Sequence, residues 1–296
     1  MFSGLSAFPL TPMNEAGVDE PAFVRLIERL ASAGVDSIGA LGSTGSYPYL
    51  ARAERLRVAQ LAVENAGNVP VMVGIGALRL RDVIDLAQDA QKAGASAVLL
   101  APVSYQKLTA EEVFGLYEAV TRTLSVPLCI YDNPGTTHFE FSDELHGRIA
   151  QLPQVRAIKI PPVSADRDAA RARVERLRAL VPSRVAIGVS GDWAGADGLN
   201  AGCDNWYSVV GGLFPQAALH IVRAAQAGEA QEAVRRSERL QPLWALFRQY
   251  GGLRVIATAA ELLGLADRPS LPLPIRSLDG AARVHLGSVL AELKLV

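Results

Sequence analysis

The chain of 296 residues is poor in cysteine and carries almost no net charge. Its two cysteines, Cys129 and Cys203, cannot build a disulfide framework, so we expect two buried thiols in a reducing compartment. The formal net charge of −1 at pH 7 provides no basic surface that would attract nucleic acid or an anionic membrane. The balance that is left is typical of an ordinary globular protein.

Long hydrophobic runs are also missing. No uninterrupted apolar stretch reaches the roughly 18 residues that a membrane-spanning helix requires. Residues 1–9 lack both the positive segment and the long apolar core of a signal peptide. We therefore expect a cytoplasmic protein.

Motifs for cofactors and metals are absent or incomplete. Residues 74–77 begin like a dinucleotide-binding turn but have Arg79 where the third glycine belongs, and residues 42–45 lack the lysine of a phosphate loop. The histidines show no metal-ligand spacing, and we expect them on helices or at the surface; they are His138, His146, His220 and His285. The sequence therefore offers no complete motif for a dinucleotide, a phosphate loop or a metal ion.

What the sequence does contain is a regular alternation of short apolar runs and amphipathic segments. The apolar runs are nearly continuous in Ala, Val, Ile and Leu, which is typical of strands buried on both faces of a parallel sheet. They lie near residues 4–8, 36–41, 70–75, 96–101, 127–131, 155–160, 185–189 and 205–209.

The segments between these runs have helical spacing, and several have clear ends. Pro21 falls in the first turn of a helix that Gly34 ends, and Thr109 with Glu112 forms a capping-box pattern. Helices are predicted over residues 19–33, 51–66, 79–93, 109–123, 142–151, 164–180, 193–200 and 215–226.

Repeated strand–helix pairs predict an α/β fold, a (β/α)8 TIM barrel with a C-terminal helical extension. A doubly wound open sheet is the alternative. After residue 226 the alternation stops, and helices are predicted over 229–248, 252–265 and 281–292. We therefore expect a catalytic barrel over residues 1–225 and a helical region over residues 226–296 that packs on it.

Lysine is scarce, and one lysine is oddly placed. The chain has four, and only Lys159 interrupts a predicted strand, the run 155–160. A buried lysine normally has a partner or a chemical task, because burial disfavours the charged amine and leaves a usable nucleophile. The alternative is a lysine at a strand end whose side chain reaches solvent.

Polar residues follow several other predicted strands, at the end where barrel enzymes place their active sites. A nucleophilic lysine, a tyrosine that moves protons and a glycine-rich turn that holds a carboxylate would together support imine chemistry. Each residue taken alone could be ordinary turn or barrel-mouth chemistry. The segments are 42–45, 101–105, 131–137, 190–192 and 207–208, beside Lys159.

These segments resemble the dihydrodipicolinate synthase / N-acetylneuraminate lyase family, whose members are pyruvate-handling class I aldolases. Five similar motifs occur in order and cover almost the whole chain. They are Phe8–Pro12, Gly42–Gly45, Tyr131–Pro134, Ile158–Lys159 and Ser190–Asp192.

The resemblance implies catalytic roles for four residues. Lys159 would form an imine with pyruvate or another 2-keto acid, and Tyr131 would relay protons. Ser43 would join this relay. Tyr105 is similar to a tyrosine that a neighbouring subunit contributes, although the spacing around it differs from that of the synthases.

Substrate-binding roles and an assembly are implied in the same way. Thr44 and Gly45, with nearby backbone N–H groups, would hold the carboxylate, and Thr136, Gly191 and Tyr207 would line the rest of the pocket. The family also implies a homotetramer that acts on a small molecule without a metal or cofactor.

Three positions depart from the family pattern. Ser46 stands where a glutamate usually closes the carboxylate loop, and Tyr207 stands where a smaller aliphatic residue is common. Thr136 occupies the place of an arginine that binds the second substrate in true synthases, and threonine cannot form that bidentate clamp.

The predicted function is therefore a lyase or aldolase that makes or cleaves a C–C bond beside pyruvate through a lysine imine. Two alternatives within this class stay open: a genuine 4-hydroxy-tetrahydrodipicolinate synthase, and a 2-keto-3-deoxy sugar acid aldolase or dehydratase. An alternative of another class is a non-catalytic keto-acid sensor.

Overall fold

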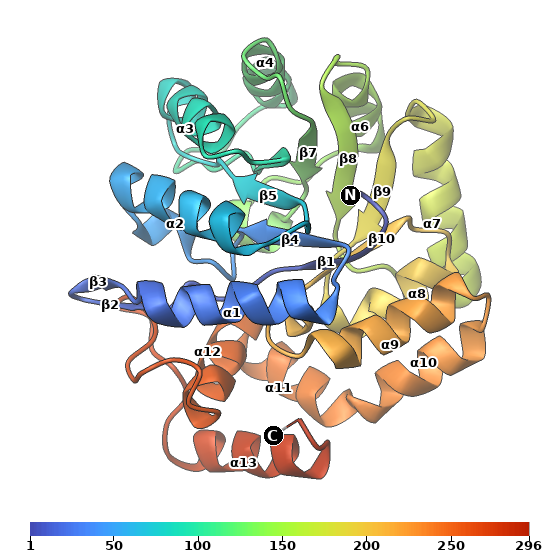
Figure 1. Cartoon of the computed structure of the whole chain (residues 1–296). Coiled ribbons are helices and arrows are strands. Elements are labelled where there is room, and N and C mark those ends of the chain that lie inside the picture. Colours follow the sequence, from blue (N-terminus) through green and yellow to red (C-terminus); the bar gives the residue numbers. More distant parts are fainter. Residues whose placement is uncertain (296) are drawn as a thin grey trace.

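Eight parallel strands form a closed barrel in the computed structural model, which describes residues 1–295 (Figure 1). Around the barrel each strand pairs with its neighbours, in the order β1-β10-β9-β8-β7-β6-β5-β4. The strands are β1 (Gly4–Ala7), β4 (Ser37–Ala40), β5 (Val71–Gly74), β6 (Ala97–Leu100), β7 (Leu128–Tyr131), β8 (Val155–Ile160), β9 (Ala186–Val189) and β10 (Asn205–Ser208). The predicted (β/α)8 barrel is confirmed, and the open sheet is wrong.

Helices alternate with the strands and surround them (Figure 1). Their apolar faces pack on the outside of the barrel, because strands buried on both faces need a second layer. The helices are α1 (Glu20–Ala33), α2 (Arg52–Asn65), α3 (Leu80–Lys92), α4 (Ala110–Thr121), α5 (Pro134–Thr137), α6 (Asp143–Ala150), α7 (Arg167–Leu180), α8 (Gly195–Asn200) and α9 (Pro215–Gln226).

Four more helices follow the barrel: α10 (Ala230–Arg239), α11 (Gln241–Tyr250), α12 (Gly252–Leu262) and α13 (Gly280–Glu292). In Figure 1, α11 to α13 lie below α1 and α9. Trp244 of α11 is fully buried and belongs to the same apolar cluster as the strands and their covering helices. The division at residue 225 stays a prediction.

The structure corrects one predicted helix and adds small elements. The segment 229–248 is two helices rather than one, since the chain turns at Leu240 and the next helix begins at Gln241, with Pro242 in its first turn. A short hairpin, β2 (Met13–Asn14) and β3 (Gly17–Val18), and the one-turn helix α5 were not predicted. Both cysteines are buried free thiols, as predicted.

The inside of the barrel holds a cluster of its own, separate from the helix-facing core. It is built mainly from small residues and three aromatic rings, which are Phe8, Tyr131 and Tyr207. Phe8 fits because Gly39 and Gly42 leave it room: a Cβ at Gly42 would lie 2.5 Å from a ring carbon, and Gly39 is as crowded. The rings thus occupy space that the glycines leave empty.

None of the helices in residues 1–295 is long and apolar enough to cross a membrane. The cytoplasmic location stays a prediction.

Candidate active site at the carboxyl end of the barrel

Lys159 lies inside the barrel, at the carboxyl-terminal end of β8. Lys159 is only 4% exposed, and its Cα pairs in register with Tyr131 of β7 on one side and Gly188 of β9 on the other. The backbone N–H of Asp132 donates to the carbonyl of Lys159 at 3.0 Å, which ties the ends of the two strands together. The Lys159 side chain is therefore buried and does not reach solvent.

Three aromatic rings surround the amine. The Nζ atom lies 3.9 Å from the ring centroid of Phe8, 4.1 Å from that of Tyr131 and 5.5 Å from that of Tyr207. Phe8 and Tyr207 meet edge to face, with centroids 5.9 Å apart. Such ring faces attract a cation by about 0.5–2 kcal/mol each, and they also keep water away from the amine. Among residues 1–295, no carboxylate forms a salt bridge with Lys159.

Tyr131 connects the amine to a group of hydroxyls. Its ring packs on Lys159, while its Oη lies 3.2 Å from the Oγ of Ser43, in the turn after β4. The residue is 6% exposed, so this hydrogen bond lies in a largely dry site. A tyrosine and a serine in contact beside a buried amine can pass a proton along a defined path.

Asn133 joins this group and was missed from the sequence. Its Nδ2 donates to Tyr131 Oη at 2.9 Å and to Thr136 Oγ1 at 2.6 Å, and reaches Ser43 Oγ at 3.5 Å. The segment 132–135 reads as a turn by composition, which hides this use of the side chain. Thr136 is exposed and contacts Asn133 rather than Tyr131 directly.

The turn after β4 carries the two residues predicted to hold a carboxylate. Thr44 and Gly45 are both buried there. The turn begins at Leu41 with φ 55° and ends at Ser46 with φ 52°, both left-handed conformations that non-glycine residues seldom adopt. Strained residues of this kind often occur at functional sites. Here they mark the two ends of the turn whose Ser43 contacts Tyr131.

Tyr207 lies deeper than the other predicted residues. It is 1% exposed, and its Oη is 3.3 Å from Cys129 Sγ. Burial raises the pKa of Tyr207 well above its ordinary value, so its phenol stays neutral. Together with Phe8 this ring forms the floor beneath Lys159.

Gly191 and Asp192 shape the exit of β9. Gly191 has φ 80°, and Pro162, just beyond Lys159, packs where its Cβ would be. The carboxylate of Asp192 accepts from Ser208 Oγ at 2.7 Å and from the N–H of Val210 at 3.1 Å. Burial raises the pKa of Asp192 to about 6, against these hydrogen bonds. Asp192 thus holds the ends of β9 and β10 together.

Tyr105 does not enter the site of its own chain. It is 91% exposed, on the connection between β6 and α4. Leu78 at 66% and Tyr49 at 48% are also exposed, on the connections that follow β5 and β4.

A buried acid and a buried histidine lie behind Tyr131. Burial raises the pKa of Asp132 to about 7, with Arg173 lowering it and Glu140 and Asp143 raising it. Burial also lowers the pKa of His146 to about 4. Their nearest atoms are 3.4 Å apart, and both ring nitrogens of His146 lack a hydrogen-bond partner, so this contact is not an ion pair at neutral pH.

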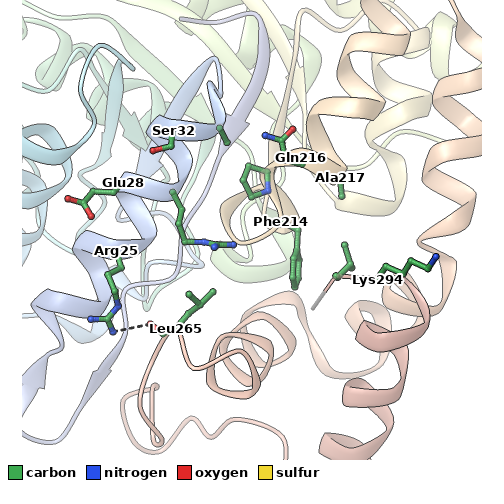
Figure 2. A pocket seen from close by; sticks show the side chains of 12 residues that line it. Arg25, Glu28, Ser32, Phe214, Gln216, Ala217, Leu265 and Lys294 are labelled. Atoms are coloured by element: carbon green, nitrogen blue, oxygen red, sulfur yellow. Dashed lines mark hydrogen bonds between the residues drawn. The ribbon is translucent and has the colours of Figure 1, made fainter.

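A cleft of about 800 Å³ lies away from Lys159, between α1, the start of α9 and the end of the chain (Figure 2). Arg25 donates there to the carbonyl of Leu265, and Phe214 lines the opening. Its one lysine, Lys294, is exposed. None of the predicted site residues lines this cleft, and it offers no buried nucleophile.

No group of three or more His, Cys, Asp or Glu side chains within residues 1–295 could hold a metal ion. The predicted independence from metal and cofactor stays a prediction.

Fold and site together define a class: a (β/α)8 barrel lyase with a buried lysine beside a tyrosine, of the Schiff-base-forming, class I aldolase type. The model of the dihydrodipicolinate synthetase family matches residues 1–293. The chain belongs to this family, and it is an enzyme of the lyase class.

Its relatives include two proteins named 4-hydroxy-tetrahydrodipicolinate synthase. That of Parvibaculum lavamentivorans is 33% identical and covers 95% of each chain, and that of Phenylobacterium zucineum is 30% identical and covers 100% of this chain and 99% of its own. A crystal structure named dihydrodipicolinate synthase, from Agrobacterium tumefaciens, is 51% identical with a TM-score of 0.94, covering 99% of this chain and 98% of its own. The chloride-inhibited dihydrodipicolinate synthase of Acinetobacter baumannii, complexed with pyruvate, is 26% identical with a TM-score of 0.91, and each chain is covered fully at 100%.

Proposed function

We propose that Lys159 forms an imine with pyruvate or a closely similar 2-keto acid, and that the enzyme makes or cleaves a C–C bond through the enamine that follows. One observation carries this proposal. Lys159 is buried with its Nζ 4.1 Å from the ring of Tyr131, whose hydroxyl contacts Ser43 at 3.2 Å. A nucleophile and a proton carrier thus lie together in one buried, water-poor site.

The chemistry begins with attack of the neutral Lys159 amine on the ketone carbon. The carbinolamine that forms must lose its hydroxyl as water, which requires a proton on that oxygen and removal of one from nitrogen. Tyr131 would give the first proton and recover it through Ser43, with which its hydroxyl is in contact. The aromatic surroundings favour this step, because they exclude the water that would hydrolyse the imine.

The turn after β4 would hold the keto-acid carboxylate, through Thr44 and the backbone N–H groups around Gly45. Transfer of a proton from C3 of the imine to the Tyr131 oxygen gives the enamine. The enamine adds to an aldehyde carbon while that proton passes from Tyr131 to the aldehyde oxygen, and the reverse sequence cleaves the same bond. Hydrolysis then returns the free amine. Relatives named dihydrodipicolinate synthase, one of them complexed with pyruvate, support pyruvate as the first substrate.

Two reactions are candidates. The names of the relatives at 29–33% identity favour condensation of pyruvate with aspartate semialdehyde, the reaction of a 4-hydroxy-tetrahydrodipicolinate synthase. Thr136 favours the other candidate, a reaction of a 2-keto-3-deoxy sugar acid that itself supplies the 2-keto group for the imine. The neutral hydroxyl of Thr136 suits the hydroxylated chain of such a substrate, since it cannot pair with a carboxylate as arginine does. Turnover of the two substrate classes by the same preparation separates these candidates.

Reductive trapping tests the imine. Borohydride added with pyruvate should give one covalent adduct per chain, and peptide mass spectrometry should place it on Lys159. A Lys159→Met variant should give no adduct, while a Lys107→Met variant, which changes another of the four lysines, should react like the wild type. An adduct on another residue, or none in the wild type, contradicts the mechanism.

We also propose a homotetramer in which Tyr105 reaches the site of a neighbouring copy. Its 91% exposure in the single chain, together with the exposure of Leu78 and Tyr49 on the connections after β5 and β4, supports a covered surface at the catalytic end of the barrel. Analytical ultracentrifugation gives the assembly directly, and a fully active monomer would exclude the proposal.

A further inference from the structure

We propose that Asn133 is a positioning residue for Tyr131, one that fixes the direction in which the tyrosine passes its proton and stabilises the phenol oxygen once the proton has left. This inference rests on the proposed imine chemistry.

The first observation is where the Asn133 side chain goes. Asn133 is the N-cap residue of α5, a position where asparagine usually accepts a hydrogen bond from the N–H groups of its own helix. Here its side chain makes no such bond. The amide turns instead toward three hydroxyls, those of Tyr131, Thr136 and Ser43.

The second observation is that the backbone carbonyl of Asn133 already holds the first turn of α5. Its carbonyl accepts from the N–H groups of Thr136 and Thr137, both at 3.0 Å, and from the hydroxyl of Thr137, also at 3.0 Å. The loop is thus held without the side chain. The side-chain amide of Asn133 can therefore be replaced while the hydrogen bonds to the Asn133 backbone carbonyl remain.

The consequence for Tyr131 follows from donor and acceptor capacity. The amide nitrogen of asparagine only donates, so the phenol oxygen accepts at this contact of 2.9 Å. The phenol has a single proton of its own. With Asn133 in place that proton points away from the amide, toward Ser43 Oγ at 3.2 Å or toward a substrate oxygen.

The same contact matters after the proton has moved. When Tyr131 gives its proton to the carbinolamine hydroxyl, negative charge develops on its oxygen. A fixed N–H donor aimed at that oxygen stabilises the charge, as donors do in an oxyanion hole, and the dry surroundings strengthen the effect. Thr136 accepts the other N–H of the amide at 2.6 Å and holds the amide in this orientation.

Two variants of nearly equal size test the inference. Asn133→Leu removes the donor and leaves an apolar group, whereas Asn133→Asp keeps the shape but places an acceptor against the phenol. Single-turnover imine formation with pyruvate, followed by borohydride quench, should slow by about 10²-fold in both. The pyruvate concentration at half-maximal rate should change by less than about threefold, because carboxylate binding is untouched.

The pH profile separates this role from a structural one. Lowering the pH protonates the new carboxylate of Asn133→Asp and restores a donor, so that variant should regain rate in acid relative to Asn133→Leu. A matched control, Thr136→Val, removes the hydroxyl that orients the amide and should slow the reaction less than either variant. Wild-type rates in Asn133→Leu, or equal pH profiles for the two Asn133 variants, would overturn the proposal.

A second readout does not depend on turnover. The ionisation of Tyr131 can be followed by ultraviolet absorbance, as the difference between each protein and its Tyr131→Phe counterpart. The phenol should ionise at higher pH in Asn133→Leu than in the wild type, and no change would also overturn the inference. If the wild type forms no imine but the phenol still ionises at higher pH in Asn133→Leu than in the wild type, only the proposed function is overturned.

Discussion

Tyr131 and Lys159 are register partners on the neighbouring parallel strands β7 and β8, and the backbone of Asp132 bonds to the carbonyl of Lys159 immediately beyond them. Residues paired across a sheet point to the same side, so both side chains enter the barrel at one level. Their approach is therefore set by the sheet rather than by flexible loops. A site built on strands is held in its geometry before the substrate arrives.

This arrangement predicts unequal effects for the two members of the hydroxyl pair. Tyr131→Phe removes the hydroxyl that contacts both Ser43 and Asn133, and kcat should fall by about 10²–10⁴-fold, the usual range for lost acid–base catalysis. Ser43→Ala should cost less, because Tyr131 keeps its contact with Asn133. Steady-state kinetics with pyruvate and the acceptor found to turn over will check both values. Equal losses would contradict this ranking.

The Phe8 ring should be important for stability as well as for the pocket. Phe8→Ala removes a ring that is 1% exposed and should lower the free energy of unfolding by about 3–5 kcal/mol. Phe8→Leu is the matched control and should be milder, since it refills part of the space between Gly39 and Gly42. Urea unfolding monitored by circular dichroism measures both. A Phe8→Ala variant as stable as the wild type would mean that the ring is not packed as described.

Asp132 predicts a specific dependence of stability on pH. Burial raises its pKa from 3.8 to about 7, so between those values the folded chain holds a proton that the unfolded chain has released. Stability from this group therefore decreases as the pH rises from about 4 to about 7 and is constant above that range. Asp132→Asn cannot titrate, and the variant should become more stable relative to the wild type as the pH increases from 5 to 8.

His146 acts in the opposite direction and has to be controlled. Its pKa is lowered from 6.5 to about 4, so its contribution to stability is lost as the pH falls from about 6.5 to about 4. The comparison of Asp132→Asn with the wild type removes most of this effect, because both proteins keep the histidine; what is left is the coupling through the 3.4 Å contact of Asp132 with His146. Urea unfolding of both proteins at three pH values is sufficient. If their free energies of unfolding change with pH in parallel, Asp132 is ionised in the folded state.

Tyr105 should affect activity without affecting the fold. Its side chain is 91% exposed, so Tyr105→Phe should leave the unfolding free energy within about 0.5 kcal/mol of the wild type. If the tyrosine serves a neighbouring copy, kcat should nevertheless fall, and mixing this variant with Lys159→Met should change the activity of the mixed assembly. Tyr49→Phe, which alters another exposed tyrosine, is the control and should remain active.

The barrel itself could be predicted closely from the sequence. Parallel strands buried on both faces give continuous apolar runs, and all eight runs became strands of the barrel. The segment 229–248 was harder, because both of its helices are amphipathic and only Pro242 marks the break. Propensity describes each residue locally, whereas the break depends on how two helices pack.

The candidate site was predictable only in part. Lys159, Tyr131 and Ser43 could be found because strand ends in a barrel meet at one face. The place of Phe8 beside Lys159 could not, since it depends on barrel closure between segments 151 positions apart and on the space at two glycines. Asn133 was missed because a turn composition does not tell which way a side chain points.

The packing of Phe8 against Gly39 and Gly42 also limits the order in which the residues around Lys159 could be substituted. Gly39 and Gly42 leave no space for a side chain while the ring is present, so a substitution at either glycine first would disrupt the barrel. Replacing Phe8 by a smaller residue first opens the space that a side chain at either glycine position would need. Evolution or directed selection toward a wider pocket therefore has one practicable first step, and the glycines become variable only after it.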